Sequence, residues 1–163
     1  MRNCELVQSL ELTVFLRIEK MEQNLSFLRM ALEEARKCEP TPTAFCVGCV
    51  ITAEDTVLST GYSRELPGNT HAEANALAKI TGPLPSDVSV YTTMEPCSVR
   101  TSGLAPCANA LIDAGIKRCY IGVGEPDDFV QCEGAQKLMN AGIEVIWLSG
   151  LEAECLEVAR RGH

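Results

Sequence analysis

The spacing of apolar residues divides the chain into alternating helical and strand segments. Between Met21 and Cys38, apolar side chains recur every three or four residues, as on one face of a helix, and Pro40 follows the end of this segment. Short apolar runs typical of strands then alternate with further helical segments. The predicted helices are residues 21–38, 70–80, 106–114, 131–140 and 151–160. The predicted strands are residues 45–52, 56–62, 88–93, 117–123 and 143–148.

This order of elements predicts an α/β fold, in which a five-stranded mixed sheet is covered by helices on both faces as a three-layer α/β/α sandwich. The short turn at residues 53–55 joins the first two strands into an antiparallel hairpin. The helix between the last two strands is a crossover connection, so that pair of strands is predicted to be parallel.

The structure of residues 1–20 is predicted separately from that of the rest of the chain. Their apolar residues also recur at helical spacing, which is typical of an amphipathic helix, although a frayed leader is the alternative. These residues are Leu6, Leu10, Val14 and Ile18, with Met21 next in the series. We therefore predict an N-terminal extension at residues 1–20 and one folded domain at residues 21–163.

Composition narrows the functional classes. The net charge of −8 argues against a nucleic-acid partner, which would require a basic face. No run approaches the roughly 18 apolar residues of a membrane span. The chain has nine cysteines, and residues 1–10 carry no secretory signal, so a reducing, cytoplasmic location is expected. Cys46 and Cys49 form a C-x-x-C pattern, but on a strand they point to opposite faces, which favours packing over redox chemistry.

The candidate chemistry lies in His71, Glu73, Cys97 and Cys107. One imidazole and two thiolates with an open fourth position are typical of a catalytic zinc site. Of the two histidines in the chain, the other is the C-terminal His163, so a His/Cys/Cys site within the fold must use His71. A glutamate two residues after the histidine ligand, followed by Pro-Cys pairs, matches the motif of zinc deaminases, in which the glutamate carries protons.

A structural alternative exists for this glutamate. Thr70-x-x-Glu73 also matches a capping box, in which Glu73 would only satisfy a backbone donor at the start of a helix. The predicted elements favour the metal site, because His71 and Cys107 lie in the first turns of two helices and Cys97 follows the carboxyl end of a strand. Open α/β sheets place their functional sites at these strand ends.

Taken together, these segments resemble the cytidine deaminase superfamily and, within it, the riboflavin-pathway diaminopyrimidine deaminases. The resemblance covers roughly residues 24–150 and is carried by residues 47–50, 71–77, 95–98, 106–108 and 114–118. Nucleoside and tRNA deaminases typically have P-C-x-x-C, whereas nine residues separate Cys97 from Cys107 here. The long insert is similar to that of the riboflavin branch.

The sequence departs from the bacterial pattern of that branch in three ways. Ala44-Phe45 stand where the bacterial enzymes have Asn-Pro, and the loop at residues 98–105 lacks their His and Lys. A chain of 163 residues is also too short for the reductase domain that follows in bacteria. These differences resemble the fungal form, in which a separate reductase acts first, and they imply a ribityl substrate.

The resemblance implies that residues 21–163 are a deaminase domain that binds Zn²⁺ through His71, Cys97 and Cys107, with Glu73 as the catalytic acid and base. It further implies a small phosphorylated pyrimidine substrate, a homodimer and a cytoplasmic location. The candidate substrate-binding residues are Gly48, Ser63, Arg64, Asn75 and Arg100. Arg100 is the first candidate for the phosphate, and Arg64 is the alternative.

Two alternative functions remain open at this point. One is a deaminase of another base, a nucleotide or tRNA adenosine within the same superfamily. The other is a deaminase-like binding module that retains zinc without catalysis. Glu73 argues against the binding module, because a purely structural zinc site has no use for a proton carrier.

Overall fold

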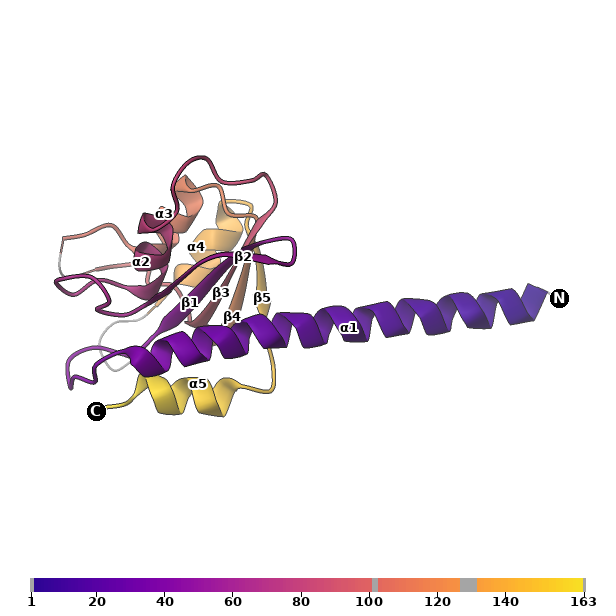
Figure 1. The fold of residues 1–163 in the computed structure, drawn as a ribbon, viewed down its shortest axis with the longest axis horizontal. Coiled ribbons are helices and arrows are strands. Elements are labelled where there is room, and N and C mark those ends of the chain that lie inside the picture. Colours follow the sequence, from indigo (N-terminus) through magenta and orange to yellow (C-terminus); the bar gives the residue numbers. More distant parts are fainter. Residues whose placement is uncertain (1, 101–102, 127–131, 163) are drawn as a thin grey trace.

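The computed structural model describes residues 2–100, 103–126 and 132–162, with side chains from residue 11 onward. One central sheet lies between two layers of helices (Figure 1). Helices α1 (Arg2–Lys37) and α5 (Glu152–Ala159) cover one face. Helices α2 (Ala72–Ala78), α3 (Cys107–Asp113) and α4 (Gly134–Asn140) cover the other. The three-layer α/β/α prediction is confirmed.

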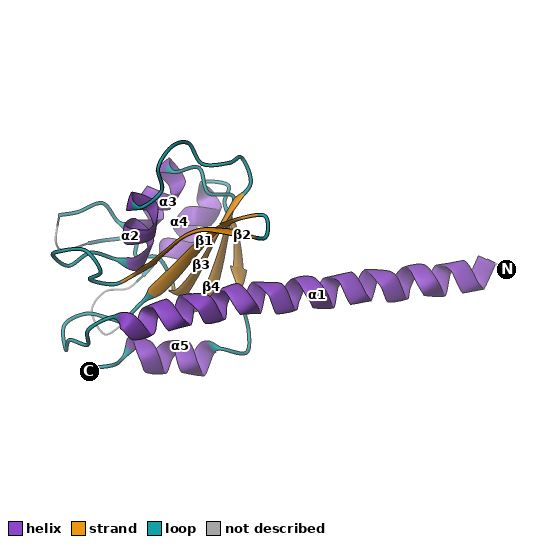
Figure 2. Ribbon diagram, viewed as in Figure 1, coloured by secondary structure: helices purple, strands orange, loops and turns teal. Residues whose placement is uncertain are grey.

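The sheet has five strands in the order β2-β1-β3-β4-β5 (Figure 2). The strands are β1 (Gly48–Ala53), β2 (Thr56–Tyr62), β3 (Val88–Met94), β4 (Arg118–Val123) and β5 (Glu144–Trp147). Strand β1 is antiparallel to both β2 and β3, whereas β3, β4 and β5 are parallel to one another. The mixed sheet and its parallel last pair are therefore as predicted. The first strand begins at Gly48 instead of residue 45, because the three preceding residues belong to the loop that follows α1.

Helix α1 is continuous over 36 residues, so residues 2–20 are helical and extend the helix predicted from residue 21. In its second half, Leu28 and Leu32 are buried against the sheet. In its first half, Leu12 and Phe15 are more than half exposed, and this half projects beyond the sheet (Figure 1). The division of the chain into an extension and a domain stays a prediction. Among the described helices, none is long and apolar enough to cross a membrane.

Two apolar cores fill the spaces between the layers. The core under α1 and α5 contains, among others, Leu28, Leu32, Tyr91, Tyr120 and Val158. The core under α2, α3 and α4 contains, among others, Ile51, Val90, Leu111, Ile121 and Leu138. Cys46 belongs to the first core and Cys49 to the second, so the two cysteines of the C-x-x-C pattern lie on opposite faces of the sheet, as predicted.

Two strand glycines allow helix backbones to approach the sheet closely. A Cβ atom on Gly48 would lie 1.9 Å from the carbonyl oxygen of Ala31 in α1. A Cβ atom on Gly61 would lie 2.4 Å from the carbonyl oxygen of Ala72 in α2. Because no side chain fits in either gap, these glycines fix the distance between each helix and the sheet. Gly61 thereby sets the position of the helix that follows His71.

Candidate metal centre and active site

Three ligating side chains from different elements converge beyond the carboxyl end of β3. His71 is the N-cap of α2, Cys107 is the first residue of α3, and Cys97 lies in the loop after β3. Their ligand atoms all lie within 4.8 Å of one another. The Nδ1 atom of His71 is 3.5 Å from Cys97 Sγ and 3.4 Å from Cys107 Sγ. One imidazole and two buried sulfurs are a donor set that suits zinc.

The two thiols share one proton unequally. The pKa of Cys97 is lowered to about 4, first because Cys107 donates a hydrogen bond to its sulfur, while burial opposes this effect. His71 and the backbone N–H of Cys107, 3.2 Å from Cys97 Sγ, lower the pKa further. The pKa of Cys107 is raised, because its proton is held against Cys97 and because it is buried. Cys97 is therefore a thiolate, the form that binds a metal.

Glu73 lies in the first turn of α2 and is buried, with 3% of its surface exposed. Its Oε1 atom accepts a hydrogen bond from Thr92 Oγ1 at 3.0 Å. Burial raises the pKa of Glu73, and the nearby charge of Cys97 adds to this rise. The side chain does not cap α2: the N-cap is His71, which makes no side-chain capping bond, and Thr70 Oγ1 instead donates to Leu66 O. The capping-box alternative is therefore wrong.

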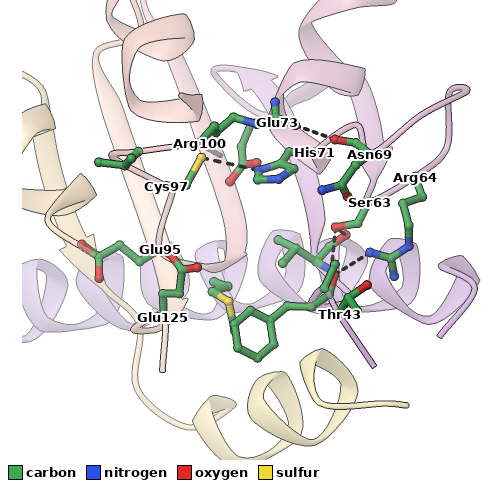
Figure 3. A pocket seen from close by; sticks show the side chains of 15 residues that line it. Thr43, Ser63, Arg64, Asn69, His71, Glu73, Glu95, Cys97, Arg100 and Glu125 are labelled. Carbon is green, nitrogen blue, oxygen red and sulfur yellow. Dashed lines mark hydrogen bonds between the residues drawn. The ribbon is translucent and has the colours of Figure 1, made fainter. Parts of the chain in front are cut away.

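A cavity of about 330 Å³ opens in front of these residues (Figure 3). Six of the residues predicted for the site line it, namely Ser63, Arg64, His71, Glu73, Cys97 and Arg100. Its wall also includes Thr43, Asn69, Glu95 and Glu125, which the sequence analysis did not name as site residues. Glu95 directly precedes the Pro-Cys pair and Glu125 follows the end of β4, so their positions at strand ends were the signal that could have found them.

Two predicted substrate-binding residues lie outside the cavity wall. Gly48 faces the backbone of α1, where a Cβ would overlap Ala31 O, so packing explains this glycine. Asn75 is buried and donates from Nδ2 to Tyr62 O at 2.8 Å and to Thr70 Oγ1 at 3.0 Å. These bonds attach α2 to the end of β2 and to the loop before the helix. The structure thus gives both residues a supporting part, and their contact with a substrate stays a prediction.

Arg100 and Arg64, the two candidate cations, differ in how they are held. Arg100 donates a hydrogen bond from Nη2 to Asn69 O across the mouth of the cavity (Figure 3). Arg64 has a left-handed backbone with φ 64°. Its guanidinium donates to Phe45 O at 3.1 Å and to Glu39 O at 2.8 Å. The guanidinium of Arg64 is therefore already engaged by the loop that precedes β1. Arg100 is the better candidate for binding an anion.

The side chain of Ser63 is likewise held by hydrogen bonds to the backbone near the cavity. Its Oγ atom accepts a hydrogen bond from Val47 N at 3.0 Å and is 3.4 Å from Val47 O. It is buried, and the Ser63 backbone N–H also donates to Val47 O. The side chain thus joins the end of β2 to the residue before β1 at the cavity wall.

Arg64 also lies between two buried thiols. Its Nη2 atom is 2.7 Å from Cys38 Sγ and 3.3 Å from Cys46 Sγ. The pKa of Cys46 is lowered to about 6, first by a hydrogen bond from Cys38 and then, against burial, by the charge of Arg64. The pKa of Cys38 is raised, because it keeps the shared proton. This pair is separate from the metal ligands and supports the Arg64 side of the cavity.

The fold and the three-ligand site define a zinc-binding α/β domain of the deaminase type. Residues 21–123 match the family described as the cytidine and deoxycytidylate deaminase zinc-binding region. The chain belongs to this family, and zinc is its cofactor.

Two known proteins similar to the chain are a diaminopyrimidine deaminase and a riboflavin biosynthesis protein. A diaminohydroxyphosphoribosylamino-pyrimidine deaminase of Schizosaccharomyces pombe is 45% identical over 150 residues, which are 90% of this chain and 37% of that protein. The riboflavin biosynthesis protein RibD of Aquifex aeolicus is 35% identical over 78% of this chain and 35% of its own length. The chain thus spans little more than a third of the length of these relatives.

The fold is also similar to that of solved deaminases. The crystal structure of the Rib2 deaminase of Aspergillus oryzae superposes with a TM-score of 0.77 at 38% identity, over 86% of this chain and 92% of that one. The same enzyme in complex with DARIPP gives a TM-score of 0.76 at 36% identity, with the same coverage of both chains.

Proposed function

We propose that the chain is a zinc-dependent hydrolytic deaminase of riboflavin biosynthesis. Its substrate in this proposal is the 5′-phosphate of a 2,5-diaminopyrimidin-4-one that carries a ribitylamino or ribosylamino group at position 6. The products are the corresponding 5-aminouracil and ammonia. The observation that carries the proposal is the convergence of His71, Cys97 and Cys107. Beside them lies the buried carboxyl group of Glu73, which lines the cavity together with His71 and Cys97. The similarity to riboflavin-pathway deaminases supports the choice of substrate.

His71, Cys97 and Cys107 are the residues that we propose as the zinc ligands. When bound, zinc supplies the Lewis acidity that lets water attack at neutral pH. Glu73 accepts one proton from the attacking water and delivers it to the ring nitrogen. It then carries the second proton, from the newly added hydroxyl group, to the amine, which leaves as ammonia. Burial suits Glu73 to this exchange, because a raised pKa brings a carboxyl group closer to the working pH.

In this proposal the phosphate is bound at the mouth of the cavity by Arg100. Its guanidinium already lies at the cavity wall, and the hydrogen bond to Asn69 O fixes its direction. A guanidinium can form two parallel hydrogen bonds with a phosphate, which makes the contact both strong and directional. Because the protein has a net charge of −8, a local cation is needed to attract an anionic substrate.

We also propose a homodimer in the cytoplasm that binds no nucleic acid. The acidic net charge supports the absence of a nucleic-acid partner. Plant relatives are named as chloroplastic, so localisation of the tagged full-length protein in its own cells is the required test. Sedimentation equilibrium gives the oligomeric state directly.

The decisive experiment measures ammonia release from the ribityl and ribosyl diaminopyrimidine phosphates, with cytidine, deoxycytidylate and a tRNA adenosine substrate for comparison. The proposal is supported if the diaminopyrimidine phosphates are deaminated and the other substrates are not. Whichever of the ribityl and ribosyl compounds is deaminated faster is then identified as the substrate. Turnover of another base would assign the chain to a different deaminase class. Zinc retention without turnover of any substrate would favour the binding module. Zinc content of His71→Ala and Cys107→Ser is measured in parallel, and full retention in either variant would exclude that residue as a ligand.

A further inference from the structure

The hydroxyl group of Thr92 is a buried polar group on a largely apolar face of the sheet. Thr92 lies on β3 with none of its surface exposed, and it pairs with Cys49 of β1 and Ile121 of β4. Val88 and Val90, which precede it on the same face of β3, belong to the apolar core under α2, α3 and α4. A buried hydroxyl without a partner is costly, so its hydrogen bonds explain why a threonine is tolerated here.

Two acceptors lie within reach of this hydroxyl group. The distance from Thr92 Oγ1 is 3.0 Å to Glu73 Oε1 and 2.9 Å to Met94 O. A hydroxyl group has one hydrogen to donate, so it can serve only one acceptor well at a time. A carboxylate is the stronger acceptor, because hydrogen bonds to a charged group are shorter and stronger than those to a neutral carbonyl. The hydrogen therefore points to Glu73 whenever its carboxyl group is ionised.

We propose that Thr92 is a positioning residue that gives the two oxygens of Glu73 different tasks, an inference that rests on the proposed deaminase function. Thr92 donates its hydrogen bond to Oε1 from the side of the sheet. Because Glu73 lines the cavity, the proposal assigns the exchange of protons with water and substrate to the other oxygen, Oε2. Held in this way, the carboxylate needs no rotation between accepting a proton and returning it. This pre-orientation is the kind of contribution that second-layer residues make to a catalytic group.

The proposal is tested with Thr92→Val, which has nearly the same shape without the hydroxyl group, and Thr92→Ser, which keeps the hydroxyl group. Thr93→Val is the matched control, because Thr93 is equally buried on the same strand and its Oγ1 atom accepts a hydrogen bond from Gly48 N at 3.1 Å. It thus loses a buried hydroxyl group that does not contact Glu73. Zinc content, melting temperature, kcat and KM are measured for each zinc-loaded enzyme.

We expect Thr92→Val to keep zinc and fold but to lose about 10- to 100-fold in kcat, with KM changed less than twofold. Thr92→Ser should recover most of this loss, and Thr93→Val should lose stability without a comparable loss of kcat. If Thr92→Val does not fold, Thr92→Ala takes its place in the same comparison. A kcat for the Thr92 variant equal to that of Thr93→Val would overturn the proposal.

A second readout does not depend on turnover. With ¹³C-labelled glutamate, the signal of the Glu73 carboxyl carbon is assigned by its absence in Glu73→Gln. We expect this signal to shift in Thr92→Val and to stay in place in Thr93→Val. An unshifted signal in Thr92→Val would also overturn the proposal. If the wild-type enzyme turned over no diaminopyrimidine, the proposed function would fail by itself, and the carboxyl signal would still decide whether Thr92 orients Glu73.

Discussion

Replacing Gly61 with alanine tests whether the close approach of α2 to the sheet sets the geometry of the site. The added Cβ would lie 2.4 Å from Ala72 O and 2.6 Å from Ala76 N, both backbone atoms of α2. Ordinary contact begins near 3.4 Å, so the helix must move by about 1 Å. Because His71 and Glu73 lie at the start of this helix, a shift of that size should lower kcat by about 100-fold. Overpacking should cost about 1–3 kcal/mol of stability as well.

The control is Gly122→Ala, which crowds the opposite face of the sheet. There, a Cβ would lie 2.8 Å from Cys155 Sγ and 2.9 Å from Thr93 O, far from α2. Both variants should melt at a lower temperature, but only Gly61→Ala should lose kcat in the zinc-loaded, folded enzyme. Thermal melting and steady-state kinetics on the same preparations separate the two effects. A Gly61→Ala enzyme with reduced stability and normal kcat would refute the link between helix spacing and catalysis.

Three further predictions follow from the site. Glu73→Gln should keep zinc and fold but lose at least about 100-fold in turnover, since it removes the proton acceptor while preserving shape; metal analysis and kinetics check this. Arg100→Ala should weaken binding of the phosphorylated substrate by about 1.5–3 kcal/mol and leave a dephosphorylated analogue unaffected, as measured by calorimetry. The pKa of Cys46, lowered to about 6 by the hydrogen bond from Cys38 and by the charge of Arg64, should make stability rise between pH 6 and pH 9, because only the folded state loses this proton in that range. Above pH 9 the raised pKa of Cys38 reverses the slope. Melting temperatures of wild type and Cys46→Ala across this range measure the effect.

Each of these predictions has an outcome that contradicts it. Normal turnover by Glu73→Gln would remove the proton-carrying role from this residue. Equal losses of affinity for both substrate analogues would show that Arg100 does not bind the phosphate. Parallel pH curves for wild type and Cys46→Ala would show that the thiol pair contributes nothing to the pH dependence of stability.

The residues of the candidate metal site could be selected from the sequence because each lies next to a recognisable local signal. His71 follows a loop and precedes an apolar helix, and Cys97 and Cys107 both follow prolines. Histidine is so scarce that the imidazole ligand could be chosen by elimination. The alternation of helices and strands likewise predicted the layers and the parallel end of the sheet, because a crossover helix leaves few topologies open.

The walls of the cavity were harder to predict, because they depend on contacts between distant segments. Asn75 was expected to face the substrate from one turn beyond His71, but its amide bonds to Tyr62 O hold it in the protein interior. Gly48 was expected near the substrate, yet the close packing of α1 accounts for it. Thr92 escaped notice because a threonine at the end of a strand is ordinary, and only the distance to Glu73 distinguishes it.

The layered arrangement also sets an order for folding during synthesis. The candidate zinc ligands and the buried residues of the core under α2, α3 and α4 have all been synthesised once the ribosome has passed Ile143. The core under α1 and α5 also needs Leu148, Leu151 and Val158, and Cys46 N donates to Ala159 O, all of which follow Ile143 in the chain except Cys46 itself. We therefore expect the nascent chain to assemble its candidate metal site first and to expose the part of the core that α5 covers until α5 emerges. Chains stalled or truncated before α5 should be the form that chaperones and proteases engage.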